Sequence, residues 1–467
     1  MARVRMIFRA RTRTSWPFPL AEALTGCYSN RRKRRLTHLI APLTIFLITL
    51  FFILWRPRGI KEMWFALAGA VVMYALRLVG PGDVADLWAE TGTVLVFLAG
   101  MLLVGYVADQ AGVFSWLAYH TARLSRGNGV LLYVGLYLTG VFVTIWFSLD
   151  TTAVVLAPIV YNLVTALGLP PLPFVFATTY VANTASLLLP VSNLTNLIVW
   201  NRFDIPFWQF ATVMALPAAA AIVVNVAFFL WLFRRDIPKR FSPAPLEQAA
   251  ASGEAGWKSD PRRLQRNLVM LAAVLLGLAA APFFGWELWA VALAGGVVMA
   301  GVELALAQLR WRQLATEIAW DLLPFVFSLF LILRGVGKSG LSELARTFLL
   351  QGGDADSLAQ LFTIAATTAL GSNLINNLPM LLVASDSLAE PVLSGRVGLG
   401  AVYAALLGTN LGPNLTVIGS LATMLSLSII GKKGLRVPGL LYVRIGVVTV
   451  PLLLAAAVAG LWLALRL

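Results

Sequence analysis

The sequence has very little of the residue types that build disulfides and most metal centres. It contains one cysteine, Cys27, and two histidines, His38 and His120, in 467 residues. A single cysteine cannot form a disulfide within the chain, and Cys27 precedes the apolar part of the sequence, which excludes a thiolate cluster at membrane depth. The apolar segments also carry no HExxH motif and no visible His/Asp pair or serine-based dyad. We therefore expect no cofactor and no enzyme active site within the membrane.

Charge is scarce as well, and apolar residues take its place. Charged residues make up 12% of the chain and hydrophobic residues 59%, with a mean hydropathy of +0.82. A soluble chain of this length could not bury so much apolar surface. Apolar runs long enough to cross a ~30 Å hydrocarbon layer as helices recur along the chain. They lie near 38–55, 60–79, 90–107, 128–147, 172–200, 208–233, 266–284, 288–307, 319–335, 357–373, 399–427 and 438–465. The sequence predicts an all-α polytopic membrane protein.

Acidic residues are outnumbered by basic ones, and the excess is concentrated near the start of the chain. The formal net charge is +15, and residues 1–37 contain ten arginines and lysines against one acid, Glu22. The basic run 31–35 directly precedes the first apolar run, which is typical of a segment on the cytoplasmic side of an inner membrane. We interpret residues 1–37 as a basic cytoplasmic tail, and we expect lipid rather than nucleic acid beside it.

A polar segment divides the apolar part into two. Residues 234–265 are basic and rich in proline and alanine, which indicates a cytoplasmic linker. The prediction is a first membrane half at 38–233 and a second at 266–467.

The two halves share landmarks in the same order, at offsets of 221 to 228 residues. In each half an amphipathic stretch follows a glycine, Gly112 or Gly340. A polar-tipped apolar segment comes next, around Asp150 or Asn376, and we interpret it as a re-entrant hairpin. A long apolar span interrupted by Asn, Pro and Gly follows, at 182–199 and 408–425. We infer two repeated halves, each with a re-entrant hairpin and an interrupted transmembrane helix.

Asparagine gathers in the hairpins and the interrupted spans of both halves. Eight of the 14 asparagines of the chain fall within these segments, which cover 62 residues. Asparagine at membrane depth is costly unless protein, water or substrate pairs with it. The clusters therefore predict the substrate site of a transporter.

The motifs within these segments are specific enough to suggest a family. SNLTN (192–196), NNLPM (376–380), LGPN (411–414) and IGSLAT (418–423) resemble the ArsB-type arsenite efflux permeases of the ion transporter superfamily. The resemblance covers roughly residues 38–467. It implies two inverted halves and extrusion of As(OH)3 or Sb(OH)3, either alone, by exchange with protons, or with a soluble ArsA-type ATPase. Family members often carry ionisable residues where this chain has Asn183, Asn410 and Asn414.

The candidate substrate site consists of amide and hydroxyl side chains from the four segments. Arsenite at neutral pH is a small uncharged trihydroxide, so its pocket needs groups that both donate and accept hydrogen bonds. The residues that we predict to bind it are Ser148, Asn193, Thr195, Asn196, Asn373, Asn376, Asn377, Asn414 and Thr416.

Asp150 is the only acid in these segments, and we predict that it binds the coupling proton. The alternative is that Asp150 caps the helix that follows it. Two rival functions also stay open. A sodium/proton antiporter of the same superfamily would need further carboxylates, and an oxyanion or carboxylate carrier would need a cationic side chain at the site.

Overall fold

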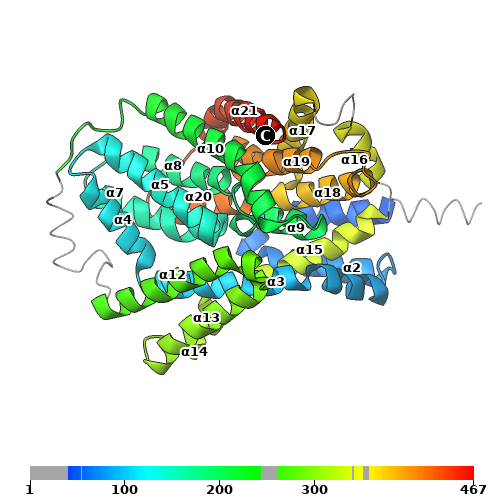
Figure 1. Cartoon of the computed structure of the whole chain (residues 1–467), viewed down its shortest axis with the longest axis horizontal. Helices are drawn as coiled ribbons and strands as arrows, with labels where there is room; N and C mark the ends of the chain where they lie inside the picture. The colour runs from blue at the N-terminus through cyan, green and yellow to red at the C-terminus, as the bar shows by residue number, and fades with distance from the viewer. Residues whose placement is uncertain (1–39, 54, 243, 245–259, 339–340, 351–356) are drawn as a thin grey trace, which may run out of the picture.

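The computed structural model describes residues 40–53, 55–242, 244, 260–338, 341–350 and 357–467. The predicted basic tail with Cys27, the next residue His38, and half of the predicted linker lie outside these ranges. All regular elements within them are helices, as the sequence predicts, and Figure 1 shows them packed side by side along the longest axis.

The first half begins with a helix at Ile40–Ile53 and the short turn η1 (Pro57–Gly59). The elements that follow are α2 (Glu62–Ala75), α3 (Pro81–Gln110), α4 (Val113–Leu124), α5 (Gly129–Phe147), α6 (Leu149–Thr151), η2 (Thr152–Leu156), α7 (Ala157–Ala166), α8 (Pro171–Ala185), η3 (Pro190–Ser192), α9 (Leu194–Arg202) and α10 (Phe207–Leu232).

The second half repeats this order. Its elements are α12 (Pro261–Phe284), α13 (Leu288–Ala305), α14 (Trp311–Glu317), α15 (Leu322–Gly337), α16 (Leu341–Leu349), α17 (Leu358–Ile375), α18 (Asn377–Leu393), α19 (Gly400–Leu411), η4 (Gly412–Leu415), η5 (Val417–Gly419), α20 (Leu421–Lys432) and α21 (Gly439–Ala464). The amphipathic stretches become α4 and α16. The polar-tipped segments become the second arms of the helix pairs α5/α7 and α17/α18.

Nine helices in the described ranges are long and apolar enough to cross a membrane, against twelve apolar runs in the sequence. The difference has a physical cause. The runs at 172–200 and 399–427 are each broken in the middle, as the Pro and Gly residues in them predict. The first two runs form only short helices, Ile40–Ile53 and Glu62–Ala75, and the span Leu149–Ala166 is additional.

One pair of matching helices shows how the halves are oriented. Lys338, just after α15, binds Asp83 in the first turn of α3, with Nζ and Oδ2 2.7 Å apart. Arg334 of α15 binds Glu90 of α3 at 2.8 Å. Because the end of α15 meets the beginning of α3, the two helices run in opposite directions, which is the arrangement expected of inverted halves.

The helix at Ile40–Ile53 starts at the end of the molecule where α3 begins. Phe52 stacks on Phe65 of α2, with ring centroids 5.5 Å apart, so the chain turns back after this helix. Met73, late in α2, packs against Gly335 at the end of α15. We call this end of the molecule the tail face.

The helix α12 starts at the other end. Gly100 and Leu103 of α3 touch Ala292 and Gly296 of α13, so these two helices run in the same direction. The end of α13 therefore lies beside the end of α3, and there Glu303 binds Arg263 from the first turn of α12. We call this end the linker face.

The two faces bear on the prediction that the N-terminal tail and the central linker both lie on the cytoplasmic side. A 30-residue helix such as α3 is about 45 Å long, which exceeds the thickness of a bilayer core. Ile40 and Pro261 therefore lie at opposite ends of α3, which is long enough to cross a membrane. The chain cannot enter at both points from the cytoplasm, because the number of crossings between them is odd.

The halves also differ in one helix. In the first half α3 is continuous. The matching helix of the second half, Trp311–Gly337, is interrupted between α14 and α15, where Ile318 adopts an extended conformation (φ −74°, ψ 141°). This break lies beside the cavity described below.

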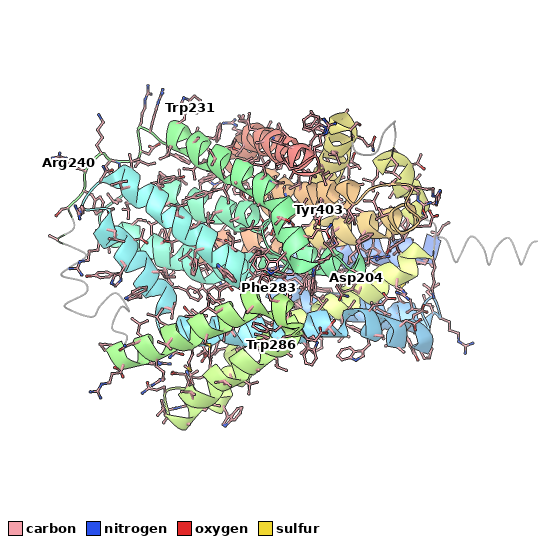
Figure 2. All side chains as sticks on the ribbon, in the orientation of Figure 1. Asp204, Trp231, Arg240, Phe283, Trp286 and Tyr403 are labelled. Carbon is pink, nitrogen blue, oxygen red and sulfur yellow. The ribbon has the colours of Figure 1, made fainter. Side chains whose placement is uncertain are left out.

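Exposed aromatic side chains mark the outer surface of the bundle. Figure 2 labels Trp231, Phe283 and Trp286, which are exposed and project from the ends of α10 and α12. Such rings are common where a helix reaches the headgroup region of a bilayer.

Candidate functional site

The two interrupted helices break near a proline, and each resumes after a polar residue at the N-cap position. After α8 the chain passes through η3, which starts at Pro190, and α9 begins after Asn193. The side-chain oxygen of Asn193 accepts a hydrogen bond from the backbone N–H of Thr195 at 3.2 Å, which caps α9. In the second half η4 contains Pro413, and α20 begins after Ser420. The predicted interruptions are present in both halves.

The two hairpin tips share an unusual backbone conformation. Ser148, between α5 and α6, has φ 110° and ψ 162°, and Asn376, between α17 and α18, has φ 73° and ψ 159°. This region of conformational space is used almost only by glycine and costs about 1–3 kcal/mol per residue. The conformation makes a turn of one residue, so α6 and α18 start directly at the tips.

Four helix N-termini line one cavity of about 980 Å³. The first residues of α6, α9, α18 and α20 all contribute to its wall: Leu149, Asp150, Leu194, Thr195, Asn377 and Leu421. The first N–H groups of a helix have no partner within the helix and carry a partial positive charge. The cavity therefore offers hydrogen-bond donors from four directions.

Asn410 of α19, which was not among the predicted binding residues, links α19 to the start of α9. The side-chain oxygen of Asn410 in α19 accepts hydrogen bonds from Asn193 Nδ2 at 2.9 Å and Thr195 Oγ1 at 2.8 Å. Its Nδ2 donates to Asn196 Oδ1 at 2.7 Å. Asn410 thus holds the start of α9 in place. Asn410 is one of the asparagines concentrated in the interrupted span 408–425, and this position in the sequence could have identified it.

A second network lies behind the cavity wall. Asn414, fully buried in η4, accepts a hydrogen bond from Asn183 Nδ2 at 2.9 Å. The hydroxyl of Thr184 receives hydrogen bonds from Asn414 at 3.4 Å and from Asn225 at 2.8 Å. Asn183 and Asn414, two of the three positions where the resemblance implied ionisable residues, therefore pair with each other across the two halves.

The predicted substrate residues divide into two groups. Asn193, Thr195, Asn376 and Asn377 line the cavity, and Asp150 lines it with them. The others lie outside its lining: Ser148, Asn196, Asn373, Asn414 and Thr416. Most of the second group is engaged in structural hydrogen bonds, such as the one from Thr416 Oγ1 to Asn373 Oδ1 at 2.8 Å.

Two amide or hydroxyl atoms from the polar motifs are buried on the cavity wall without a hydrogen-bond partner in the described part of the chain. They are Nδ2 of Asn376, which is 5% exposed, and Oγ of Ser420, which is 1% exposed. A buried polar group without a hydrogen bond costs about 1–3 kcal/mol. Each comes from one of the two polar motifs of the second half, and both suit a small ligand with hydroxyl groups.

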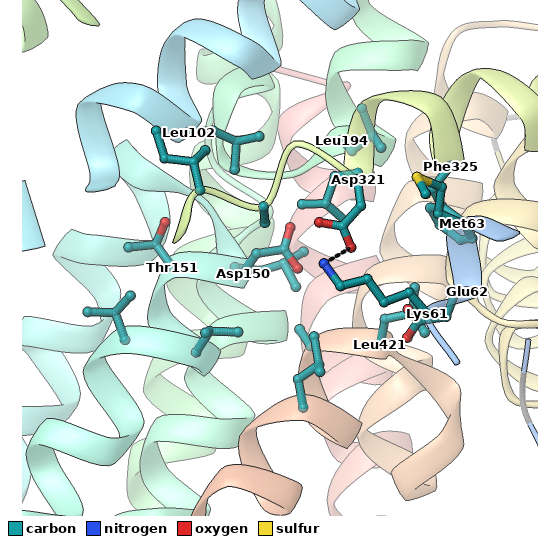
Figure 3. A pocket seen from close by; sticks show the side chains of 18 of the residues that line it. Lys61, Glu62, Met63, Leu102, Asp150, Thr151, Leu194, Asp321, Phe325 and Leu421 are labelled. Carbon is teal, nitrogen blue, oxygen red and sulfur yellow. Dashed lines mark ion pairs between the residues drawn. The ribbon is translucent and has the colours of Figure 1, made fainter. Parts of the chain in front are cut away.

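The cavity wall also carries charged side chains, and Figure 3 labels Lys61, Glu62 and Asp321 among them. Lys61 pairs with Asp321 there, with Nζ and Oδ2 3.3 Å apart, and Arg56 pairs with Glu62. Tyr106 donates a hydrogen bond to Glu317 at 2.8 Å. These residues lie outside the four polar motifs and reach the cavity only through tertiary packing, so no spacing in the sequence pointed to them.

Two carboxyl groups in the cavity have no ion-pair or hydrogen-bond partner among the described residues. They are Asp150, in the first turn of α6, and Asp109, at the end of α3. The elements are in contact, because a Cβ added at Gly105 of α3 would lie 3.6 Å from Thr151 Oγ1. The sequence pointed to Asp150 alone.

Comparison with known proteins gives consistent matches along almost the whole chain. A family model described as "Arsenical pump membrane protein" matches residues 41–465. The arsenical pump membrane protein of Escherichia coli (strain K12) is 31% identical over 427 residues, which cover 91% of this chain and 98% of that protein. A putative arsenical pump membrane protein of Bacillus subtilis (strain 168) is 24% identical over 87% of this chain and 95% of its own length.

A solved structure shares the fold. The YdaH transporter of Alcanivorax borkumensis, described as having an unusual topology, superposes with a TM-score of 0.55 at 15% sequence identity. The match covers 90% of this chain and 98% of that chain. At this identity the likeness concerns the arrangement of helices alone.

Proposed function

We propose that this chain, which belongs to the arsenical pump membrane protein family, exports arsenite and antimonite as neutral trihydroxides in exchange for protons. The family resemblance of the motifs is confirmed, and the chain is a multi-pass membrane transporter rather than an enzyme. The observation that carries the finer proposal is the cavity where four helix N-termini meet the unpartnered polar atoms of Asn376 and Ser420.

The chemistry of this wall suits a small trihydroxide. As(OH)3 donates and accepts hydrogen bonds, and it meets amide groups, a hydroxyl group and free backbone N–H donors here. The sulfur among the described lining residues is the thioether of Met63, a weak acceptor. Binding through hydrogen bonds alone is weak enough for release, which a transporter needs at every cycle.

An anionic substrate is disfavoured by the same cavity. Helix N-termini alone would also suit an oxyanion. Asp109 and Asp150, however, are carboxyl groups with no ion-pair partner among the described residues, and when ionised they would repel one. A neutral trihydroxide is not repelled by them.

Sodium/proton exchange is a second candidate, and one observation favours it. Two unpaired carboxyl groups, Asp109 and Asp150, line a single cavity, whereas the sequence motifs contain one acid. A desolvated cation needs several oxygen ligands of this kind. Sodium therefore belongs in any substrate test.

The charge distribution supports a cytoplasmic linker face. The short connections there carry many basic residues: Arg123, Arg126, Arg234, Arg235, Lys239, Arg240, Arg262, Arg263, Arg266, Arg310, Arg312, Lys432, Lys433 and Arg436. Basic residues of the tail face are instead balanced by acids, as in the pairs Lys338–Asp83 and Arg346–Glu390. The rule that basic loops face the cytoplasm then places the linker face inside the cell.

The cavity opens toward this linker face. Its lining includes residues at the linker ends of two elements: Asp109 and Gln110 of α3 and Lys432 of α20. A linker face inside the cell corresponds to an inward-open state, which loads substrate from the cytoplasm.

Asp150 is the residue that we propose to carry the coupling proton. It lies at a hairpin tip beside the amide wall, and its carboxyl group is free to bind a proton. One proton moving inward against a neutral trihydroxide moving outward transfers one net charge. A membrane potential of 100 mV adds about 2.3 kcal/mol to this cycle.

Transport into everted membrane vesicles tests the proposal. With the respiratory chain active and soluble proteins washed away, the vesicles should accumulate arsenite and antimonite, and a protonophore should abolish the gradient. Sodium, citrate and arsenate serve as alternative substrates. Accumulation that appears only with an added ArsA-type ATPase and ATP would contradict proton exchange, and sodium uptake without arsenite uptake would replace the proposed substrate.

A further inference from the structure

The ion pair between Lys61 and Asp321 stands on the cavity wall and is loosely held. Lys61 is the residue before α2, and Asp321 precedes α15 at the break of the second-half helix. The Lys61 side chain is 63% exposed and the Asp321 side chain 24%. Exposed pairs of this kind contribute about 0–1 kcal/mol, so the lysine can leave Asp321 at little cost.

Asp150 shares the cavity with this pair. Figure 3 shows the Lys61 amine directed into the cavity toward Asp321, with the Asp150 carboxyl group on the same side. Lysine carries its charge on a flexible four-carbon chain and can change partners by rotation alone. In the state described, Asp321 has the lysine and Asp150 has no partner.

The other charged groups around the cavity are differently placed. Arg56 is paired with Glu62, and Glu317 accepts a hydrogen bond from Tyr106. Asp109 adds a further acid from α3, and Lys432 ends α20 at the linker face. Lys61 is the cavity lysine that already pairs with one carboxylate of the cavity wall, and Figure 3 shows this pair together with Asp150.

We propose that Lys61 is a counter-charge shared by Asp321 and Asp150. It pairs with Asp321 while Asp150 carries a proton, and it turns to Asp150 when that proton leaves. The inference rests on the proposed role of Asp150 in proton exchange. It adds a positioning residue from outside the polar motifs, and it connects the proton to the break between α14 and α15, because Asp321 loses its partner when Asp150 gains one.

The pH dependence of arsenite transport in everted vesicles tests this proposal with four proteins: the parent, Lys61→Gln, Asp321→Asn and the double variant. Without Lys61, Asp150 keeps its proton to higher pH. The midpoint, which is the pH at which arsenite transport is half-maximal, should therefore rise by roughly half a pH unit. With Asp321 neutralised, Lys61 is free to pair with Asp150, and the midpoint should fall by a similar amount. In the double variant Asp321→Asn should have no effect beyond that of Lys61→Gln.

A matched control and the remaining outcomes separate this inference from the proposed function. Lys432→Gln removes another cavity lysine and should leave the midpoint unchanged. If Asp321→Asn shifts the midpoint equally with and without Lys61, then the Asp321 carboxylate acts on Asp150 directly. In that case the inference is wrong. Unshifted midpoints in all variants would overturn it too. Transport by the parent that ignores pH and protonophores would overturn proton exchange itself. Arsenite exchange without a gradient shows that each variant is folded.

Discussion

At Asn376 the backbone and the side chain make different demands on the residue. The backbone conformation, with φ 73°, is one that glycine adopts most easily, yet the side chain presents an unpartnered amide group to the cavity. A residue kept in a costly conformation at a cavity wall is a candidate for function rather than for stability.

Substitution separates these demands. Asn376→Gly should relieve the backbone and leave the thermal unfolding temperature equal or higher, while Asn376→Ala should lower it. Both variants lose the amide group, so both should reduce arsenite transport by a factor of about 5 to 150, which corresponds to one hydrogen bond of about 1–3 kcal/mol. Asn162→Ala is the control, because Asn162 is exposed and is not among the residues that line the cavity. Full transport by Asn376→Gly would remove Asn376 from the binding site.

Asp150 permits a test of coupling that leaves binding intact. Asparagine keeps the shape and the hydrogen-bonding capacity of aspartate but cannot carry a proton. Asp150→Asn should therefore still exchange arsenite across vesicle membranes at equal concentrations, and it should lose accumulation against a gradient. If Asp150 instead only caps the start of α6, asparagine would serve nearly as well. Retained uphill transport in the Asn variant would establish that capping role.

At the scale of elements, α12 and α13 are joined through one fully buried carboxylate. Glu303 binds Arg263 at 2.7 Å, binds Arg266 and accepts a hydrogen bond from Asn267 at 2.9 Å. A buried charge that loses its partners is far more costly than a neutral group in the same place.

The expected order of stability among variants follows from that asymmetry. Replacing both Arg263 and Arg266 with alanine leaves the buried Glu303 carboxylate without a counter-charge. The free energy of unfolding should then fall by about 3–5 kcal/mol. Glu303→Gln keeps a hydrogen-bonding side chain without the charge and should cost about 1 kcal/mol. Thermal unfolding in detergent measures the order. A larger loss from Glu303→Gln than from the double arginine variant would contradict it.

The elements differ in how far the sequence predicts them. The breaks at Pro190 and Pro413 and the apolar helices follow from local rules, because proline, glycine and long apolar runs act on the chain around them. The one-residue tips at Ser148 and Asn376 do not follow, since neither residue favours a positive φ as glycine does. The hairpins therefore include the preceding helices α5 and α17, which the sequence presented as ordinary spans.

The same distinction applies to the site. The amide wall was predicted because its asparagines are clustered along the chain, and four of the nine predicted binding residues line the cavity. The charged wall was missed, because Lys61, Asp109 and Asp321 come from three helices that meet only in the folded molecule. Asn225, an isolated asparagine in the sequence, also joins the buried network through Thr184.

At the scale of the whole molecule, the opposite ends of α3 make a prediction about membrane orientation. Cysteine labelling suits this chain because Cys27→Ser leaves a background free of thiols. In that background, Arg396→Cys on the tail face should react with a membrane-impermeant maleimide in intact cells. Arg126→Cys on the linker face should react only in everted vesicles. The reverse pattern would mean that the described cavity opens away from the cytoplasm.

The unlike shapes of α3 and of the helix Trp311–Gly337 have a consequence for the second state of the transport cycle. These two helices, one straight and one bent, occupy matching positions in the two halves. The rotation that superposes one half on the other also exchanges the two sides of the membrane. If the straight segment bends and the bent one straightens, the molecule returns to an equivalent shape with its entrance on the opposite side. The two end states would then contain nearly the same set of contacts and differ little in free energy. A carrier with that property moves in whichever direction its gradients dictate, and reversing the proton gradient should load arsenite into cells.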